Sequence, residues 1–370
     1  MPEKQTSPYF ASDIYFTEPL PWLAQTWQML INQSQLSHAL LFAGVKGLGK
    51  RHLVWQFVAY LLCQNRDSQR ACGSCQSCLW LKANTHPNLK VLPAHHLPTL
   101  IDEVDKNKKS SAKINQDKPA KSSIKIDDIR ALTPFLSQHS DAPRIVVVDD
   151  ADTMTVAAAN ALLKSLEEPA PNVYFLLITD SPTKLLPTIL SRVQRVALTI
   201  PTTPIIIQGH AKDNNIQATV NYIKSHLNQN VTDVQIQQAL NLVQNAPLQV
   251  MELLQSDWYA KRDLWLKTWH ALRTGKRTST AASDYWQGEV YLQDFIELCH
   301  IMLGEVMRVR YEMPATTQDI NWQAYSFIAN IPIDRLSALQ QTIADIQRSG
   351  QQNVQDKLGY DKLMQALAET

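Results

Sequence analysis

A short apolar run, from Ala39 to Ala43, leads directly into a glycine-rich turn and then into a helical pattern. The turn has the form Gly44-x4-Gly49-Lys50. Glycines at this spacing let backbone N–H groups curl around a phosphate, and the lysine and the helix N-terminus add positive charge. A buried strand that feeds such a loop is typical of a parallel sheet covered by helices. The sequence therefore predicts an α/β fold built around a phosphate loop.

Other segments of the chain support this fold. Arg144 to Asp149 and Val173 to Thr179 are apolar runs without polar alternation, as expected for buried parallel strands. A helical stripe lies between them and ends at Pro169, which cannot continue a helix. After Pro201 only helical patterns follow. We expect an α/β domain first and helical domains after it.

The phosphate loop departs from the usual pattern directly after Lys50. A serine or threonine hydroxyl normally stands there and ligates Mg²⁺, whereas this chain has Arg51. A guanidinium has no lone pair for a metal ion, and its own charge repels one. A purely structural turn and weak nucleotide binding remain as alternatives, with hydrolysis the least expected.

Carboxylates follow the second apolar run. Asp149 and Asp150 stand where a nucleotide hydrolase keeps one acid for Mg²⁺ and another to orient water. Asp150 replaces the usual glutamate and is one methylene shorter, which reduces its reach. The alternative role for this acidic segment is helix capping, by Asp152 or Thr155. We predict that the shape of a hydrolase site is retained without its chemistry.

Four of the five cysteines form the pattern Cys63-x8-Cys72-x2-Cys75-x2-Cys78. Four thiolates close a tetrahedral shell around Zn²⁺ and leave no open position, so a structural zinc knuckle over 63–78 is expected. A redox C-x-x-C pair and free buried thiols are the alternatives. Cys299 stands alone on an apolar helix face and fits a core position.

Bulk properties limit the function classes. The chain has 370 residues, enough for two or three domains, and a net charge of +1, so charge alone does not indicate DNA binding. The polar start, Met1 to Pro8, does not resemble a secretion signal, and no apolar run of about 18 residues is present. Clustered cysteines in odd number favour a reducing, cytoplasmic location. The polar segment over 102–123 is predicted to be a mobile insertion, with a basic DNA-binding loop as the alternative.

Taken in this order, these motifs make the chain similar to the bacterial clamp-loader branch of the AAA+ family. Leu190-Ser191-Arg192-Val193 resembles the family's Ser-Arg-Cys motif, with Val193 in place of the cysteine. The segment from Ala158 to Pro169 resembles the helix after the acidic strand, and Thr179 matches the position that senses the γ-phosphate. The resemblance implies that Arg192 points into the ATP site of the next subunit. A surface salt bridge is the alternative role for this arginine.

The resemblance also implies the architecture. Residues 1–200 would form an AAA+ base with a five-stranded parallel sheet, 201–256 a small helical lid, and 257–370 an all-helical collar that joins subunits into a ring. Four tryptophans of the C-terminal region would pack as core residues of the collar: Trp258, Trp265, Trp269 and Trp286.

The implied function is to load a sliding beta clamp onto primer–template DNA within the DNA polymerase III assembly, a nucleotidyltransferase as a whole. The partners would be tau/gamma and delta in a hetero-pentameric ring. Tau/gamma subunits keep a Ser or Thr directly after the lysine of the phosphate loop, and they keep an arginine in the lid. This chain has Arg51 at the first position and no arginine in the corresponding lid stretch, Asn245 to Gln249. These departures favour a member without intrinsic ATPase over an ATP-hydrolysing tau/gamma type. A zinc-knuckle nucleic-acid binder outside replication would leave Arg192 unexplained.

Overall fold

The computed structural model describes residues 14–93, 123–138, 140–198, 214–227, 231–317, 319–349 and 356–370. Two predictions, on the polar start of the chain and on the 102–123 insertion, lie outside the described residues apart from Ser123. The chain divides into two compact units. The first comprises Met1–Asn228 and Gln244–Gln249, and the second Gln229–Val243 and Val250–Thr370.

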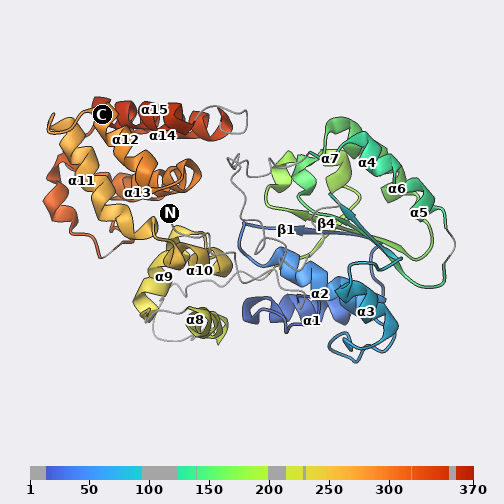
Figure 1. Cartoon of the computed structure of the whole chain (residues 1–370). Helices are drawn as coiled ribbons and strands as arrows, with labels where there is room; N and C mark the ends of the chain where they lie inside the picture. Colours follow the sequence, from blue (N-terminus) through green and yellow to red (C-terminus); the bar gives the residue numbers. More distant parts are fainter. Residues whose placement is uncertain are drawn as a thin grey trace, which may run out of the picture. The chain divides into compact units, whose positions relative to one another are not determined.

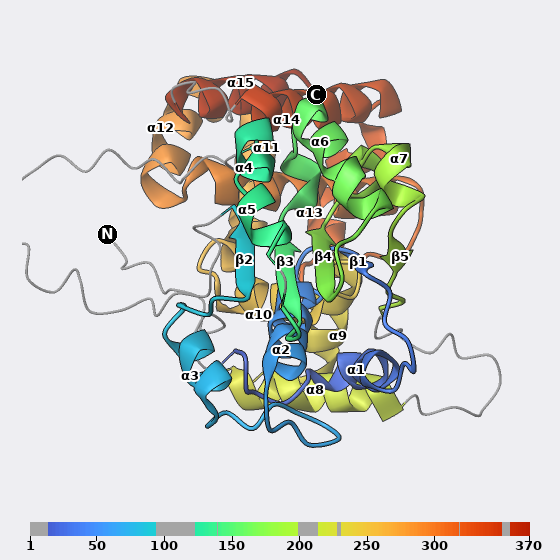
Figure 2. The ribbon, with the colours of Figure 1, turned by 90° about the vertical axis from the view of Figure 1, so that its right-hand side faces the viewer.

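A five-stranded parallel sheet forms the centre of the first unit, which confirms the predicted fold class. Its strand order is β2-β3-β4-β1-β5, as Figure 2 shows. The strands are β1 (Ala39–Ala43), β2 (Leu89–Leu92), β3 (Arg144–Val148), β4 (Val173–Thr179) and β5 (Gln194–Arg195). Ala43 lies in register with Thr179, and Val148 with Leu177. The phosphate loop, the acidic strand end and Thr179 therefore meet at one edge of the sheet.

Helices cover both faces of this sheet (Figure 1). Along β1, Leu40 and Phe42 face one apolar core, whereas Ala39 and Leu41 face the other. Burial on both faces explains why the strand is apolar throughout. One layer contains α1 (Ala24–Ile31), α2 (Lys50–Leu62) and α3 (Gln76–Lys82), and the other contains α4 (Ile126–Arg130), α5 (Thr133–Leu136), α6 (Val156–Glu167) and α7 (Pro187–Leu190).

Short helical turns and one further helix also belong to the first unit. The turns are η1 (Pro21–Leu23), η3 (Ala151–Thr153) and η4 (Pro182–Lys184). The helix α8 (Asn214–His226) packs against η1, where the rings of Trp22 and Tyr222 meet edge-on at 5.4 Å. An edge-on approach places the positive edge of one ring on the negative face of the other.

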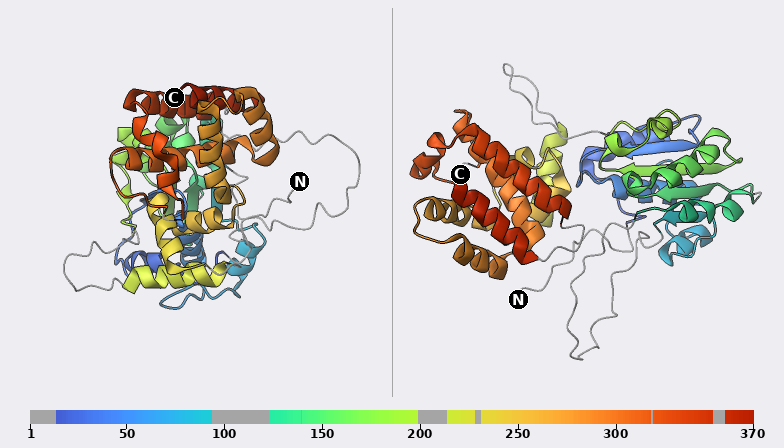
Figure 3. Two further views of the ribbon diagram at one scale, coloured as in Figure 1. Left: turned by 90° about the vertical axis from the view of Figure 1, so that its left-hand side faces the viewer. Right: turned by 90° about the horizontal axis from the view of Figure 1, so that it is seen from above.

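Every regular element in the described residues of the second unit is a helix. Trp265, Trp269 and Trp286 are fully buried at its centre, as is Cys299, which accepts a hydrogen bond from the Trp265 indole N–H. The C-terminal helices α14 (Ile333–Ser349) and α15 (Asp356–Glu369) pack side by side, in red in Figure 3. The elements after α8 are α9 (Asp233–Leu242), α10 (Pro247–Gln255), η5 (Tyr259–Lys261), α11 (Arg262–Arg273), α12 (Ser279–Glu289), α13 (Leu292–Arg310), η6 (Trp322–Asn330), α14 (Ile333–Ser349) and α15 (Asp356–Glu369).

The region predicted as a lid, 201–256, is shared between the two units: α8 belongs to the first and α9 to the second. The boundaries at residues 200 and 256 stay predictions. In the described part of the chain, no helix combines the length and the apolar character that a bilayer span requires.

Candidate functional site

The turn between β1 and α2 requires glycine at two of its positions. Gly47 and Gly49 have φ angles of 81° and 90°, in the left-handed region that favours glycine. A Cβ atom added to Gly47 would lie 2.7 Å from Gln249 Cβ, and one on Gly49 would lie 2.4 Å from Leu20 Cδ1. Gly44 anchors the other end of the turn, because its N–H donates to the Thr179 carbonyl at 3.3 Å. The loop is thus packed closely on both sides.

Lys50 is buried, and its ammonium group is satisfied within the chain. Nζ lies 2.7 Å from the carbonyl oxygens of Gly44 and Val45 and 2.6 Å from Asp180 Oδ1. An ammonium group has three N–H donors, and these contacts use all of them. Burial lowers the pKa of Lys50, and the neighbouring Asp180 opposes that shift. Asp180 was not predicted from the sequence, although its place directly after Thr179 at the strand end is a usable signal.

Arg51 lies between the two carboxylates of the acidic strand end. Its Nε donates to Asp149 Oδ2 at 2.6 Å, and Nη2 donates to Asp150 Oδ1 at 2.8 Å. Burial works against the charge of Arg51, but the attraction of Asp149 and Asp150 outweighs it and raises the pKa of the guanidinium. Both carboxylates are therefore bound to one guanidinium, that of a residue in the first turn of α2.

The remaining polar residues at this edge also bind one another. Thr179 is buried; its hydroxyl donates to Asp152 Oδ1 at 2.8 Å and accepts from the Ser181 N–H at 3.0 Å. Of the two capping candidates, Thr155 caps α6 by accepting from the Ala158 N–H at 3.2 Å, whereas Asp152 binds Thr179. Thr179 is thus held by contacts within its own subunit.

The cysteine motif gathers into one cluster. The four Sγ atoms all lie within 4.8 Å of one another. The pairs Cys63–Cys75 and Cys72–Cys78 are separated by 3.9 Å, and Cys75–Cys78 by 3.5 Å. Four sulfurs bound tetrahedrally at about 2.3 Å from one ion lie about 3.8 Å apart. The cluster therefore has the size that a four-thiolate metal site requires and is too wide for disulfides.

Backbone groups and burial act in opposite directions on these thiols. Chiefly the Ser74 N–H, with help from that of Cys75, lowers the pKa of Cys72 to about 6. Burial raises the pKa of Cys78. A cation at the centre of the cluster would favour the thiolate form of every cysteine. Cys63, Cys72, Cys75 and Cys78 could thus hold a metal ion.

A buried hydrogen-bond chain supports the helix that carries Cys78. His86 Nδ1 accepts from the Asn88 N–H at 3.1 Å, so Nε2 carries the proton and donates to Ser77 Oγ at 2.8 Å. Ser77 in turn donates to the Leu62 carbonyl at 2.7 Å. Burial lowers the pKa of His86 to about 4, which keeps the ring neutral.

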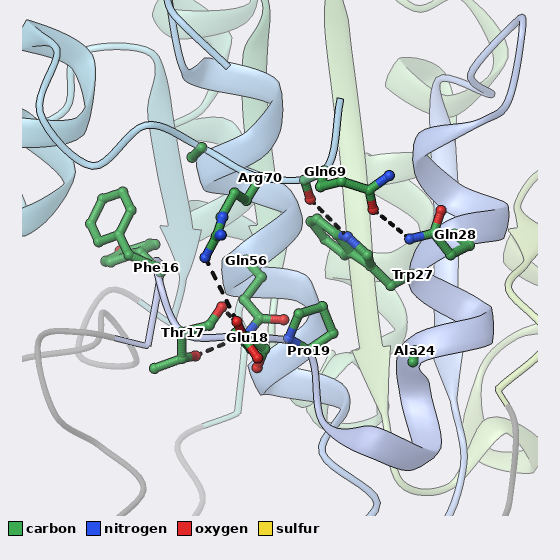
Figure 4. A pocket seen from close by; sticks show the side chains of 12 residues that line it. Phe16, Thr17, Glu18, Pro19, Ala24, Trp27, Gln28, Gln56, Gln69 and Arg70 are labelled. Atoms are coloured by element: carbon green, nitrogen blue, oxygen red, sulfur yellow. Dashed lines mark hydrogen bonds and ion pairs between the residues drawn. The ribbon is translucent and has the colours of Figure 1, made fainter. Parts of the chain in front are cut away.

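A cavity of about 310 Å³ lies between α1, α2 and the loop that leads into the cysteine cluster (Figure 4). Gln69 bridges one side of it, because its carbonyl accepts from the Trp27 indole N–H at 2.9 Å and its side chain binds that of Gln28. Arg70 pairs with Glu18 at 3.8 Å on the other side. The phosphate loop does not line this cavity. The contacts of Gln69 and Arg70 hold the loop before the cysteine cluster against α1 and against the segment that precedes α1.

Arg192 lies after α7, away from these clusters, and its side chain is 34% exposed. Nη1 donates to the Thr188 carbonyl at 2.9 Å and to Ser191 Oγ at 3.2 Å. Nη2 lies 2.6 Å from Glu167 Oε1, at the end of α6. The surface salt bridge that was the alternative role for Arg192 is thus present in the single chain. Glu167 was part of the quoted helix motif, but this partnership was not predicted.

Comparisons with known proteins agree with the clamp-loader resemblance. The family model described as "DNA polymerase III, delta subunit" matches residues 21–202. The DNA polymerase III subunit delta′ of Pseudomonas aeruginosa is 36% identical over 192 residues, 51% of this chain and 50% of its own length. That of Yersinia pestis is 32% identical over 269 residues, 71% of this chain and 67% of its own length. The match spans half of the first relative and two thirds of the second.

A solved structure of a DNA polymerase III gamma subunit-related protein from Thermotoga maritima aligns with 94% of this chain and 99% of its own. The sequence identity is 16% and the TM-score 0.44, so the fold is assigned from the sheet order of the chain itself. Arg51 and the lid stretch favoured a subunit other than tau/gamma. The similarity to delta′ subunits agrees with that prediction. On the strength of the match to two thirds of the Yersinia pestis protein, the chain belongs to the DNA polymerase III delta′ family.

Proposed function

We propose that this chain is the non-hydrolysing delta′ member of a clamp loader, which places a sliding beta clamp on primer–template DNA during replication. In this role Arg192, with Ser191 beside it, serves the ATP site of an adjacent tau/gamma subunit. The delta subunit would be the other neighbour in a hetero-pentameric ring, and the cytoplasm the compartment. With a net charge of +1, the chain's own contact with DNA would be modest and directed at the backbone.

The contact of Arg51 with Asp149 and Asp150 carries the non-hydrolysing part of this proposal. ATP hydrolysis of this class needs Mg²⁺ to bridge the phosphates and to neutralise developing charge. Here a guanidinium already binds both carboxylates that would hold the ion, and Lys50 is paired with Asp180. A tau/gamma type of subunit would need the carboxylates free for the metal ion and the lysine free for the nucleotide. The geometry therefore supports a retained fold without turnover.

The position and chemistry of Arg192 support a role in a neighbouring site. A planar guanidinium suits the charge that spreads over phosphate oxygens in the transition state of phosphoryl transfer. Arg192 is partly exposed at the end of α7, and its Ser191-Arg192 pair matches the family motif. It makes no described contact with the phosphate loop of its own chain. These observations support an action of Arg192 on the ATP site of a partner.

We further propose that the cysteine cluster binds one structural Zn²⁺. Cys63, Cys72, Cys75 and Cys78 would supply the four ligands, since their sulfur spacing fits a tetrahedral thiolate shell. When bound, the ion contributes folding energy and no catalysis, because four protein ligands leave no open position.

Replacement of Arg192 in a loader reconstituted with tau/gamma and delta tests the proposed role. Arg192→Ala should leave the subunit folded and able to assemble, yet slow DNA-stimulated ATP hydrolysis and clamp loading. Such fingers contribute roughly 10³- to 10⁵-fold at a single site. The effect on the whole complex is smaller, because other tau/gamma sites keep their own arginines.

Arg192→Lys should rescue little, since an ammonium group lacks the planar fork. Arg195→Ala, at an exposed position three residues further along, is the matched control and should behave as the unaltered subunit. Normal ATPase and loading with Arg192→Ala would reduce Arg192 to a surface ion pair and leave the family assignment in place.

A further inference from the structure

We propose that Glu167 is a positioning residue for Arg192: it holds the guanidinium in the orientation that the neighbouring ATP site uses. This inference rests on the proposed function, because it presumes that Arg192 acts in trans. It adds a second residue of this chain to the chemistry of that site.

The contacts around Arg192 hold the guanidinium from two elements. The end of α7 fixes Nη1 through the Thr188 carbonyl and Ser191 Oγ, at 2.9 and 3.2 Å. The last residue of α6, Glu167, binds Nη2 at 2.6 Å from its Oε1. Contacts at both nitrogens restrict the plane of the group as well as its position.

A long arginine side chain loses rotamer freedom when it docks on an anion in a neighbouring subunit. Contacts that already restrict the group before docking reduce this loss, and the fork of the guanidinium then meets the phosphate in the correct plane. Glu167 is suited to this task because its charge strengthens the hydrogen bond. It lies at the C-terminus of a helix whose packed face is buried, which gives it a fixed base.

The pair is also accessible enough to act at an interface. The side chains of Arg192 and Glu167 are 34% and 48% exposed. An exposed ion pair is weakened by salt, so a positioning effect should depend on ionic strength. Loss of local folding would not show this dependence.

The test compares Glu167→Gln with Arg192→Ala, and both with the double variant, in the loader assembled with tau/gamma and delta. Glutamine keeps the shape of the side chain and removes its charge. We expect Glu167→Gln to lower kcat of the DNA-stimulated ATPase by about two- to five-fold at low salt, the contribution that an exposed pair can make. KM for ATP should not change, and the difference from the unaltered loader should shrink at high salt. Glu168→Gln, at the exposed neighbouring position, is the matched control and should have no effect.

The double variant separates the positioning role of Glu167 from the proposed action of Arg192. If Glu167 acts through Arg192, Glu167→Gln should add nothing to Arg192→Ala. An equal further loss in the double variant, or a kcat that rises in Glu167→Gln, overturns the positioning role. A normal rate with Arg192→Ala alone overturns the proposed function instead, whatever Glu167→Gln does.

Discussion

The phosphate loop and the cysteine cluster both belong to the first unit, and both bring together groups that can bind a cation. They differ in whether the chain itself supplies that cation. At the phosphate loop the chain supplies the cation itself, since Arg51 binds Asp149 and Asp150. At the cysteine cluster four sulfurs face one another at the spacing of a metal site. In the first arrangement the carboxylates are paired within the chain, and in the second the sulfurs could hold a metal ion.

This difference shows that a motif predicts which groups meet but not which charges they leave available. Glycine and lysine spacing correctly indicated the loop, and cysteine spacing correctly indicated the cluster. At the phosphate loop, the availability of the carboxylates depends on one further residue, Arg51, whose long side chain reaches both of them. A loop can thus keep its backbone shape while the carboxylates beside it are paired within the chain.

The cysteine cluster should give the largest effect. Cys75→Ser should release the bound zinc and destabilise the first unit by about 3–5 kcal/mol, because metal binding at such a site is folding energy. Elemental analysis and thermal melting measure the two effects. Cys299→Ala, in the core of the second unit, is the control and should keep the zinc content. If a carefully prepared protein contains no zinc, the cysteine cluster is not a zinc site, and this contrast with the phosphate loop does not hold.

At the phosphate loop, Arg51→Ala should destabilise the protein by about 2–4 kcal/mol, because two buried carboxylates lose their counter-charge. Asp149 and Asp150 are 1% and 6% exposed. Millimolar Mg²⁺ should restore part of the loss in the variant and leave the unaltered protein unchanged. Melting curves with and without Mg²⁺ measure this, with Lys46→Ala in the exposed part of the loop as the control. An unchanged stability would mean that Arg51 is not the internal cation.

A smaller, pH-dependent effect is expected at His86, beside the cysteine cluster. Burial lowers the pKa of its imidazole from 6.5 to about 4, so the unfolded chain takes up a proton that the folded chain does not. Stability from this group is complete above pH 6.5 and falls toward pH 4, by about 1.4 kcal/mol per pH unit. His86→Gln should flatten this part of the profile. Unfolding free energies measured in denaturant between pH 7 and 4.5 provide the test, and parallel profiles for the two proteins would contradict it.

The sheet could be predicted from sequence because its central strands are buried on both faces. Runs such as Val173–Thr179 are therefore apolar without interruption, and the structure has β4 at those residues. The cysteines and two loop glycines, Gly44 and Gly49, could be predicted because their chemistry requires fixed local spacing, whereas the positive φ of Gly47 was not predicted. These features depend on residues close together in the chain.

The ion pairs could not be predicted in the same way, since their partners are distant in sequence. Lys50 meets Asp180, and Arg192 meets Glu167, only after the strands and helices have packed. No periodicity marks such partners. The lid boundary has a different difficulty: α8 and α9 are both amphipathic helices, yet packing assigns them to different units.

Nucleotide binding and turnover by the purified chain test the central claim most directly. ATP should be titrated with and without Mg²⁺, and hydrolysis followed on a sample whose zinc content is measured. The account predicts one zinc per chain, no gain in ATP affinity from Mg²⁺, and hydrolysis at background. Steady turnover that Lys50→Ala abolishes would contradict it, because the phosphate loop would then be open and the chain would act as an ATPase in its own right.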